Sequence, residues 1–352
     1  MNKGLHICIL ALTLLVSFCL GYFAFRYCNQ QPETIEDTAL ETASNEYGPY
    51  TIDLISPNIW HIQDFNTENP AGESFDEQGE KTHFNNCSDL YLLKGDHAAL
   101  LVDLSNYIQW NDSAVASLRH LVAERIGDLP LTITFTHNHG DHVGMLPAYK
   151  EDKAVKFALS KEDFEDRLEF FPEGQYCLIE EGYTFDLGGL EVNTVKVPGH
   201  TKGSVIFDVK GRDILLTGDA VGSGHGVWIF DRTGFDLYKE AVPHLIEYVT
   251  DPSNGIDTTA LRVFGGHYWQ KDWMAPDRQG INAPALPALT DGQELGMSYL
   301  RDMEQAVCET IDGTVRREDS GLNFKNLDSY FIHGSAVIVW NKDQAEEMQN
   351  EK

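Results

Sequence analysis

The first apolar segment of the chain is long and carries no formal charge. It runs from Gly4 to Phe25, with Lys3 before it and Arg26 after it. A helix over these residues would extend about 33 Å at about 1.5 Å per residue, enough to cross the hydrocarbon core of a bilayer. No small-residue cleavage site accompanies the segment, so it predicts an uncleaved signal anchor over residues 1–28 rather than a removed signal peptide. A narrow excess of positive charge before the segment favours a membrane-anchored protein with its remaining chain outside the cytoplasm.

The pattern changes twice after the anchor. Residues 29–49 are polar and acidic without apolar periodicity, which predicts a flexible tether. From Tyr50 onward, short β-branched and aromatic stretches alternate with helical patterns, which is typical of a mixed α/β domain. We therefore expect one folded domain over residues 50–352. It includes a C-terminal tail with a helix at Glu294–Ile311 and a strand at Ser329–Trp340.

The predicted elements of this domain follow from local spacing. Helices are expected at Ser113–Arg125 and Asp236–Tyr248, where apolar residues recur at helical intervals. Two polar or proline-containing stretches, Asp64–Asn86 and Gln270–Gly292, are expected to be inserted loops. The predicted strands are Tyr50–Ile55, Ile59–Ile62, Leu90–Leu93, Ala98–Val102, Leu131–Thr136, Val155–Ala158, Glu191–Val197, Ser204–Val209, Asp213–Thr217 and Leu261–Phe264.

Composition narrows the range of partners. The chain has 55 acidic residues against 26 Lys and Arg, which gives a formal net charge of −29. Such a surface repels polyanions, so nucleic acid is not expected as a partner. The hydrophobic content of 42% lies in the globular range, so a substantial core can form. The six cysteines show no paired spacing, and no disulfide framework is predicted.

One short segment concentrates residues that bind metals. The strand LTITFT leads into His137, and His139, Asp141 and His142 follow within the next five positions. Residues two apart in an extended turn face the same way, and Gly140 allows a tight reversal into a helix. Imidazole and carboxylate groups suit Zn²⁺ or another first-row divalent ion. One loop rarely completes a metal site, so further ligands are expected elsewhere.

Three more candidates occupy equivalent places, each directly after a predicted strand. They are His200 in VKVPGH, Asp219 in DILLTGD and His267 in LRVFGGH. Sites in α/β proteins form beyond the carboxyl ends of strands, so these side chains are expected to meet the His137 segment at one edge of a sheet. A single histidine is more often a satisfied core residue than a ligand. Seven candidates in this order and context favour a metal site.

This set of motifs, HxHxDH followed by a His, a strand-terminal Asp and a final His, resembles the metallo-β-lactamase superfamily over about Tyr50–Tyr268. The resemblance implies an α/β fold, a four-layer αββα sandwich, which here would follow the transmembrane anchor. It also implies two divalent metal ions. One would be bound by His137, His139 and His200, the other by Asp141, His142 and His267, with Asp219 bridging them. The superfamily usually has Thr-Gly after the Asp of an early strand, and Leu104–Ser105 follow Asp103 here. This departure affects a supporting turn and no ligand.

Hydrolysis is the chemistry that the resemblance implies. A water molecule between two divalent ions loses its proton near neutral pH, because even one Zn²⁺ lowers the pKa of bound water to about 7. The metal-bridged hydroxide would be the nucleophile, and Asp141 is expected to orient it and to handle protons. Zn²⁺ is the preferred ion, while Mn and Fe also suit His and Asp ligands.

The resemblance also bears on the substrate. An aspartate at the position of Asp219 is found in the thioesterase, lactonase and phosphodiesterase branches and not in the true β-lactamases. We therefore expect a hydrolase of the hydroxyacylglutathione hydrolase or lactonase type, acting on a small-molecule ester, thioester or lactone. Two alternatives stay open. One is a phosphodiesterase for a small substrate such as a choline-bearing one, and the other is a non-catalytic binding module that a metal stabilises.

Aromatic residues follow two of the ligands, and one further histidine lies among glycines. Trp228, Phe230, Tyr268, Trp269 and Trp273 are candidates for the lining of an apolar pocket, with ordinary packing as the alternative. His225, in the segment Gly222–Asp231, is a candidate catalytic acid or base, with a surface or structural role as the alternative.

Overall fold

The computed structural model describes residues 47–48, 50–64, 73–75, 81–83, 88–107, 112–223, 226–267, 295–321 and 327–351. The predicted anchor and most of the predicted tether lie outside these ranges. Among the helices within them, none combines the length and the apolar character needed to cross a membrane.

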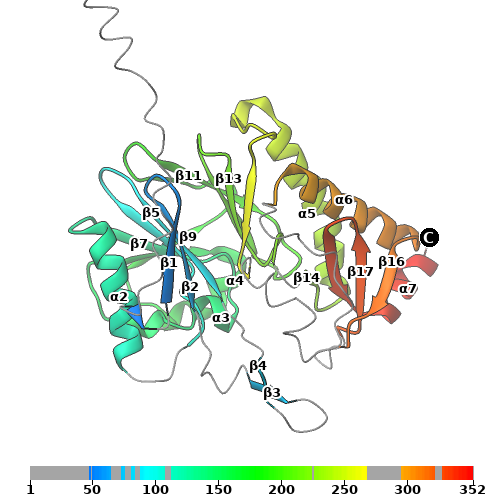
Figure 1. Cartoon of the computed structure of the whole chain (residues 1–352), viewed down its shortest axis with the longest axis horizontal. Helices are drawn as coiled ribbons and strands as arrows, with labels where there is room; N and C mark the ends of the chain where they lie inside the picture. The colour runs from blue at the N-terminus through cyan, green and yellow to red at the C-terminus, as the bar shows by residue number, and fades with distance from the viewer. Residues whose placement is uncertain are drawn as a thin grey trace, which may run out of the picture. The chain divides into compact units, whose positions relative to one another are not determined.

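A seven-stranded sheet forms the first part of the folded unit (Figure 1). One of its faces packs on helix α2 (Asp112–Ile126) through Leu118, Leu121 and Val122, which share one side of that helix because they are three and four residues apart. Its strands, in spatial order, are β1 (Tyr50–Ser56), β2 (Ile59–Asp64), β5 (Asp89–Lys94), β6 (Ala99–Val102), β7 (Leu131–Thr134), β8 (Lys156–Ser160) and β9 (Tyr176–Ile179).

The second sheet has five strands and is covered on both faces. Every residue of β12 and β13 is buried, as expected for strands enclosed between two layers. The core around them includes Ile59 and Leu100 of the first sheet and Leu245 of helix α5 (Arg232–Thr250). The layers therefore run helix, sheet, sheet, helix. In spatial order the strands are β10 (Thr184–Asp186), β11 (Glu191–Lys196), β12 (Val205–Val209), β13 (Ile214–Gly218) and β15 (Arg262–Gly265).

A third sheet, absent from our prediction, is built largely from the C-terminal part of the chain. Helix α6 (Met297–Asp312) runs beside its strands β17 and β18 (Figure 1). Phe235 of α5 stacks on Trp340 with ring centroids 4.2 Å apart. Such a pair contributes about 0.5–1.5 kcal/mol beyond simple burial, and here it ties α5 to this sheet. The strands, in spatial order, are β14 (Val227–Trp228), β18 (Ala336–Trp340), β17 (Ser329–His333) and β16 (Arg316–Asp319), followed in sequence by α7 (Lys342–Asn350).

Residues 227–230 alternate between the two faces of this third sheet. Val227 and Ile229 are buried in the large core, whereas Trp228 and Phe230 are half-buried against a separate cluster on the opposite face. A period of two is the strand pattern, so the two aromatic side chains project on the same side. That side faces the centre described below.

All ten strands predicted up to Phe264 occur within two residues of the expected bounds, whereas β9, β10 and β14 were not predicted. The single strand predicted at Ser329–Trp340 is wrong, because it is the hairpin β17–β18. Its turn is held by Asp302, which accepts hydrogen bonds from the backbone N–H and the hydroxyl of Ser335 at 2.7 and 2.8 Å, a contact that local patterning cannot reveal. The stretch expected as a loop at Asp64–Asn86 contains the paired strands β3 (Glu73–Phe75) and β4 (Lys81–His83).

The remaining short elements lie in the connections between strands. They are α3 (Gly140–Val143), α4 (Lys161–Phe164) and the 3₁₀ helices η3 (Leu146–Ala148), η4 (Glu165–Phe170) and η5 (Pro252–Asn254).

Candidate metal centre

The predicted ligands sit where strands of the two large sheets end. His137 and His139 follow β7, and His139 immediately precedes α3, which carries Asp141 and His142. Strands β13 and β15 are parallel neighbours, with Gly218 paired to Gly265. Their carboxyl ends therefore lie side by side, and this brings the two residues that follow, Asp219 and His267, to the same edge.

Three histidines form a first group, named here the first triad: His137, His139 and His200. One ring nitrogen of each lies within 4.8 Å of the corresponding atoms of the other two. The closest approach is 2.9 Å, between Nε2 of His200 and Nδ1 of His139. Three imidazole nitrogens facing one point match the donor set of a first-row divalent ion.

The second triad consists of Asp141, His142 and His267. Its ligand atoms also lie within 4.8 Å of one another, and Nε2 of His267 is 3.3 Å from Oδ2 of Asp141. His142 and His267 are buried, while Asp141 is partly exposed. The carboxylate is therefore the member of this triad that a bound molecule can best reach.

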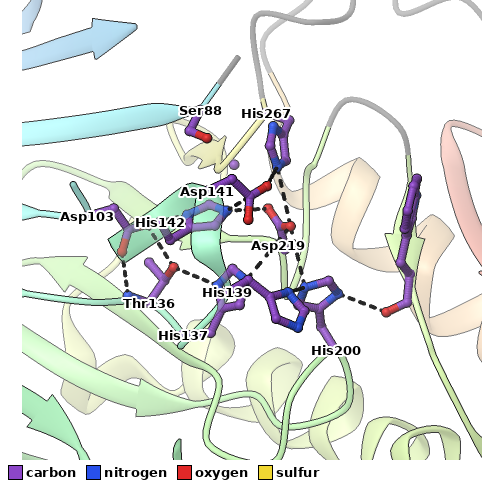
Figure 2. Close-up of polar contacts among 12 residues, drawn as sticks. Ser88, Asp103, Thr136, His137, His139, Asp141, His142, His200, Asp219 and His267 are labelled. Atoms are coloured by element: carbon purple, nitrogen blue, oxygen red, sulfur yellow. Dashed lines mark hydrogen bonds and ion pairs between the residues drawn. The ribbon is translucent and has the colours of Figure 1, made fainter. Parts of the chain in front are cut away.

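Asp219 lies between the two triads (Figure 2). Its Oδ2 is 3.4 Å from Nε2 of His200 and 3.4 Å from Nε2 of His267. Its Oδ1 is 3.5 Å from Nε2 of His142. One carboxylate therefore faces histidines of both triads, which is the arrangement expected of a bridging ligand.

Asp103 orients His142 of the second triad through the ring nitrogen that faces away from the centre. Its Oδ2 lies 2.9 Å from Nδ1 of His142 and accepts the hydroxyl of Thr136 at 2.8 Å, while its Oδ1 accepts the Thr136 backbone N–H at 2.8 Å. Because a carboxylate can only accept here, Nδ1 of His142 carries the hydrogen. In the neutral ring, the lone pair then lies on Nε2, which faces the centre.

A backbone carbonyl performs the same task for the first triad. Nδ1 of His200 lies 2.8 Å from the carbonyl oxygen of Trp228 in β14. The carbonyl can only accept, so Nδ1 donates and the Nε2 lone pair of the neutral ring points toward His139 and Asp219. The third sheet thus fixes the tautomer of a predicted ligand that lies in the connection between β11 and β12 of the second sheet.

Several buried polar atoms at the centre lack a hydrogen-bond partner among the described residues. They are Nε2 of His137, Nε2 of His142 and Oδ1 of Asp219. Unpaired buried polar atoms are rare and need an explanation. A Cβ atom at Gly266 would lie 2.5 Å from Oδ1 of Asp219 and 2.7 Å from Cε1 of His142, so a side chain there would fill the same space. The donor set, the unpaired atoms and this glycine all fit divalent metal ions.

The electrostatics of the first triad favour neutral rings. Burial, together with neighbouring imidazoles, lowers the pKa of His137 well below its usual value. The same causes lower the pKa of His139 to about 3, and burial lowers the pKa of His200. Neutral imidazole is the form that binds metals, so these rings are ready to act as ligands at neutral pH.

The second triad has the opposite balance. Burial opposes charge on His142 and His267, yet the carboxylate of Asp219 raises the pKa of both rings well above the usual value. Burial likewise opposes ionisation of Asp219, but His267 and His142 hold its pKa well below the usual range. The carboxylate of Asp219 therefore favours positive charge at the second triad, and either protons on the two rings or a bound cation can supply that charge.

The structure brings together all seven predicted ligands. Of the aromatic candidates, Phe230 lies beside the first triad, with its ring centroid 5.5 Å from that of His139 and 5.4 Å from that of His200. Trp228 adds its carbonyl, as described, and its ring lies 6.4 Å from that of Phe230. The candidates that lie outside the described residues are His225, Tyr268, Trp269 and Trp273.

The supporting roles of three residues were not predicted. Asp103 was noted only as the end of a strand, although an acidic residue after the apolar run ALLV is itself a signal of a functional strand end. Asp163, buried in α4, contacts both loops of the first triad. The Trp228 carbonyl could not have been identified from sequence, since any residue type offers the same group.

Comparison with known proteins agrees with this geometry. A family profile described as the metallo-beta-lactamase superfamily matches residues 88–258, a range that includes six of the seven ligands. A hydroxyacylglutathione hydrolase of Prochlorococcus marinus (strain MIT 9301) is 32% identical over 106 residues, which cover 30% of this chain and 41% of that protein. The lactamase-like protein ptaB of Pestalotiopsis fici is 27% identical over 183 residues, covering 50% of this chain and 48% of that protein. The chain thus spans less than half of each of these relatives.

A solved structure shares the fold. The metallo-beta-lactamase from Pontibacter korlensis superposes with a TM-score of 0.50 at 14% identity, covering 74% of this chain and 99% of that one. At this identity the likeness concerns the fold alone. Together with the profile match and the curated relatives, it leads to one conclusion: the chain belongs to the metallo-beta-lactamase superfamily.

Proposed function

We propose that the protein is a metal-dependent hydrolase of a small ester, thioester or lactone. The observation that carries the proposal is the position of Asp219, whose carboxylate faces histidines of both triads at 3.4–3.5 Å. A purely structural metal site is closed by its own ligands. Two triads that share one carboxylate leave coordination positions for water and substrate.

The chain's residues have separate tasks in this proposal. The first triad would hold one divalent ion, the second triad the other, and Asp219 both. When bound, such ions supply positive charge that polarises a substrate carbonyl and lowers the pKa of water. Asp103 and the Trp228 carbonyl accept the Nδ1 hydrogens of His142 and His200, so in the neutral rings the inward Nε2 atoms can bind the ions.

Asp141 is the proposed catalytic carboxylate. It is the most exposed acidic group of the centre, and His142 lowers its pKa although burial opposes ionisation. The carboxylate therefore stays ionised at neutral pH. As an acceptor, it can orient an attacking water molecule by taking a hydrogen bond from it.

Two features support an uncharged substrate with an apolar acyl group. The aromatic ring of Phe230 lies within 5.5 Å of two first-triad rings, so a molecule bound there meets an apolar face. The net charge of −29 disfavours highly anionic substrates away from the centre itself. The partial similarity to a hydroxyacylglutathione hydrolase is consistent with a thioester, although it covers only 30% of this chain.

A substrate panel tests the proposal. Protein stripped with a chelator and reloaded with Zn²⁺ is assayed on nitrophenyl esters, an acyl thioester, a lactone and a phosphodiester. Turnover of at least one carboxylic substrate should return with metal, and Asp219→Ala should reduce it by more than about 10²-fold, since losing a ligand exceeds the effect of losing an outer-shell group. The exposed Asp128→Asn is the matched control. Stoichiometric metal without turnover of any substrate would instead identify a binding module.

We further propose, from sequence alone, that the segment Gly4–Phe25 anchors this domain to a membrane. The absence of charged residues over a bilayer-spanning length supports the proposal. The full chain should remain in the membrane fraction after an alkaline carbonate wash, and a variant that begins at residue 29 should not. Release of the full chain by the wash would refute anchoring.

A further inference from the structure

A buried carboxylate outside the proposed ligand set links the two loops of the first triad. Asp163 lies in the short helix α4 and is 6% exposed. Its Oδ2 accepts the hydroxyl of Thr201 at 2.7 Å and the backbone N–H of Asn138 at 3.2 Å, and its Oδ1 accepts the N–H of Gly203 at 2.7 Å. One side chain therefore binds two segments that are far apart in sequence.

Both segments carry ligands. Asn138 is the residue between His137 and His139, and its side-chain amide also donates to the backbone carbonyl of Asp163 at 2.8 Å. Thr201 directly follows His200. Every ligand of the first triad is thus an immediate neighbour of a residue that hydrogen-bonds Asp163.

The Gly203 side of this contact depends on close packing. A Cβ atom at Gly203 would lie 2.5 Å from the backbone nitrogen of Asp163 and 2.8 Å from its carboxylate. Only glycine lets the loop approach this closely. The hydroxyl of Ser160, the last residue of β8 and the one directly before α4, also donates to the Gly203 carbonyl. The loop after His200 is therefore attached to α4 at several points.

We propose that Asp163 is a positioning residue for the first metal site. The proposal rests on the metal centre of the proposed function. His139 and His200 face each other with nitrogens 2.9 Å apart, and both rings must serve the same cation. These two rings come from different loops, so any separation of the loops weakens their joint binding. Asp163 sets that spacing by holding Asn138 and Thr201 on a single carboxylate.

The second triad has no such contact with Asp163 among the described residues. His142 is held by Asp103, and His267 follows strand β15 on the opposite side of the centre. Loss of the Asp163 carboxylate should therefore weaken one site selectively. A residue that only stabilised the fold would affect both sites alike.

One-site backgrounds separate these outcomes. In the full chain, His267→Ala leaves the first triad intact and His200→Ala leaves the second. Zn²⁺ affinity is measured in each background by competition with a chromophoric chelator, with and without Asp163→Asn. We expect about 10–100-fold weaker Zn²⁺ binding in the His267→Ala background, the range found for outer-shell residues, and less than about twofold change in the His200→Ala background. Asp166→Asn, exposed on the neighbouring turn, is the control.

Two results would overturn the proposal: equal weakening in both backgrounds, or no weakening in either. If Asp163→Asn does not fold, as judged by thermal unfolding of the metal-free protein, Thr201→Val replaces it. That nearly isosteric change removes one hydrogen bond to Asp163 and should weaken the first site alone, by about tenfold. Unchanged Zn²⁺ affinity of Thr201→Val would then count against the proposal. Zn²⁺ affinity is measured independently of turnover. A protein that hydrolyses no substrate would therefore contradict the proposed hydrolase function without contradicting the positioning role of Asp163.

Discussion

Replacement of Asp103 by Asn should weaken metal binding while leaving the backbone undisturbed. Asp103 has a φ of +66°, a left-handed conformation that Asn adopts as readily as Asp. The change therefore alters the hydrogen bonding and removes the negative charge beside His142, and it leaves the backbone conformation as it is. The carboxylate oxygens accept three hydrogens, two from Thr136 and one from Nδ1 of His142. An amide has only one oxygen, so its NH₂ group must face either the ring of His142 or the N–H of Thr136.

The size of the effect follows from the interaction lost. A hydrogen bond to a charged group contributes about 1.5–3 kcal/mol. In Asp103→Asn one such bond is lost, because the NH₂ group of the amide then faces another hydrogen-bond donor. If His142 moves its hydrogen to Nε2 to relieve this conflict, the lone pair leaves the atom that faces the centre. At about 1.4 kcal/mol per factor of ten, the expected loss is about 10–100-fold in affinity of the second triad.

The assay is Zn²⁺ competition in the His200→Ala background, where only the second triad is complete. Thermal unfolding of the metal-free variant reports any general loss of stability, and the exposed Asp128→Asn serves as the control. An Asp103→Asn protein that binds Zn²⁺ within twofold of its background would show that this carboxylate does not orient His142. The account of the ligand tautomers would then be wrong.

Three further predictions concern metal, substrate and pH. Removal of metal by a chelator should lower the melting temperature by several degrees, because ligand at 100 times its Kd stabilises the native state by about 2.7 kcal/mol. Addition of Zn²⁺ should restore the melting temperature. An unchanged melting curve would argue against a metal centre. Phe230→Ala should raise KM for a long-chain ester by about tenfold relative to an acetate ester, whereas equal effects on both would exclude an acyl contact. His61 is buried with Nε2 2.7 Å from Asp89, which raises its pKa above 6.5 although burial opposes the charge. Its contribution to stability is therefore complete below pH 6.5 and is lost as pH rises through the folded-state pKa. His61→Gln should reduce this decline in the free energy of unfolding, which is measured by denaturant titration in excess Zn²⁺ from pH 6 to 9. The exposed His97→Gln is the control. A decline in His61→Gln as steep as that in His97→Gln would contradict the assigned role of His61.

The proximity of the seven predicted ligands could be expected from sequence because each is coupled to a strong local pattern. His137, His139 and His142 lie within one short segment, so their proximity follows from chain geometry. Asp219 and His267 each follow an apolar strand, and the strands preceding them are parallel neighbours. Sequence patterns find strands well, and strand ends of an α/β sheet meet at one edge.

The residues that support the ligands could not be predicted in the same way. Asp163 lies in a four-residue helix, and its partners Asn138 and Gly203 are 25 and 40 positions away. Nothing in the local pattern distinguishes it from the exposed Asp166 three residues later. Its burial and its contacts are products of tertiary packing, which periodicity does not encode.

The third sheet shows how tertiary context also reaches the ligands themselves. The tautomer of His200 depends on the carbonyl of Trp228, and among the described strands β14 pairs only with β18. The backbone N–H of Ile229 donates to Val339 as well, at 2.9 Å. Residues 336–340 lie well beyond the range 88–258 that the family profile matches. Six of the seven predicted ligands lie within that range, whereas the strand that pairs with β14 lies after it. The position of the carbonyl that orients His200 therefore depends on a part of the chain that the profile does not match.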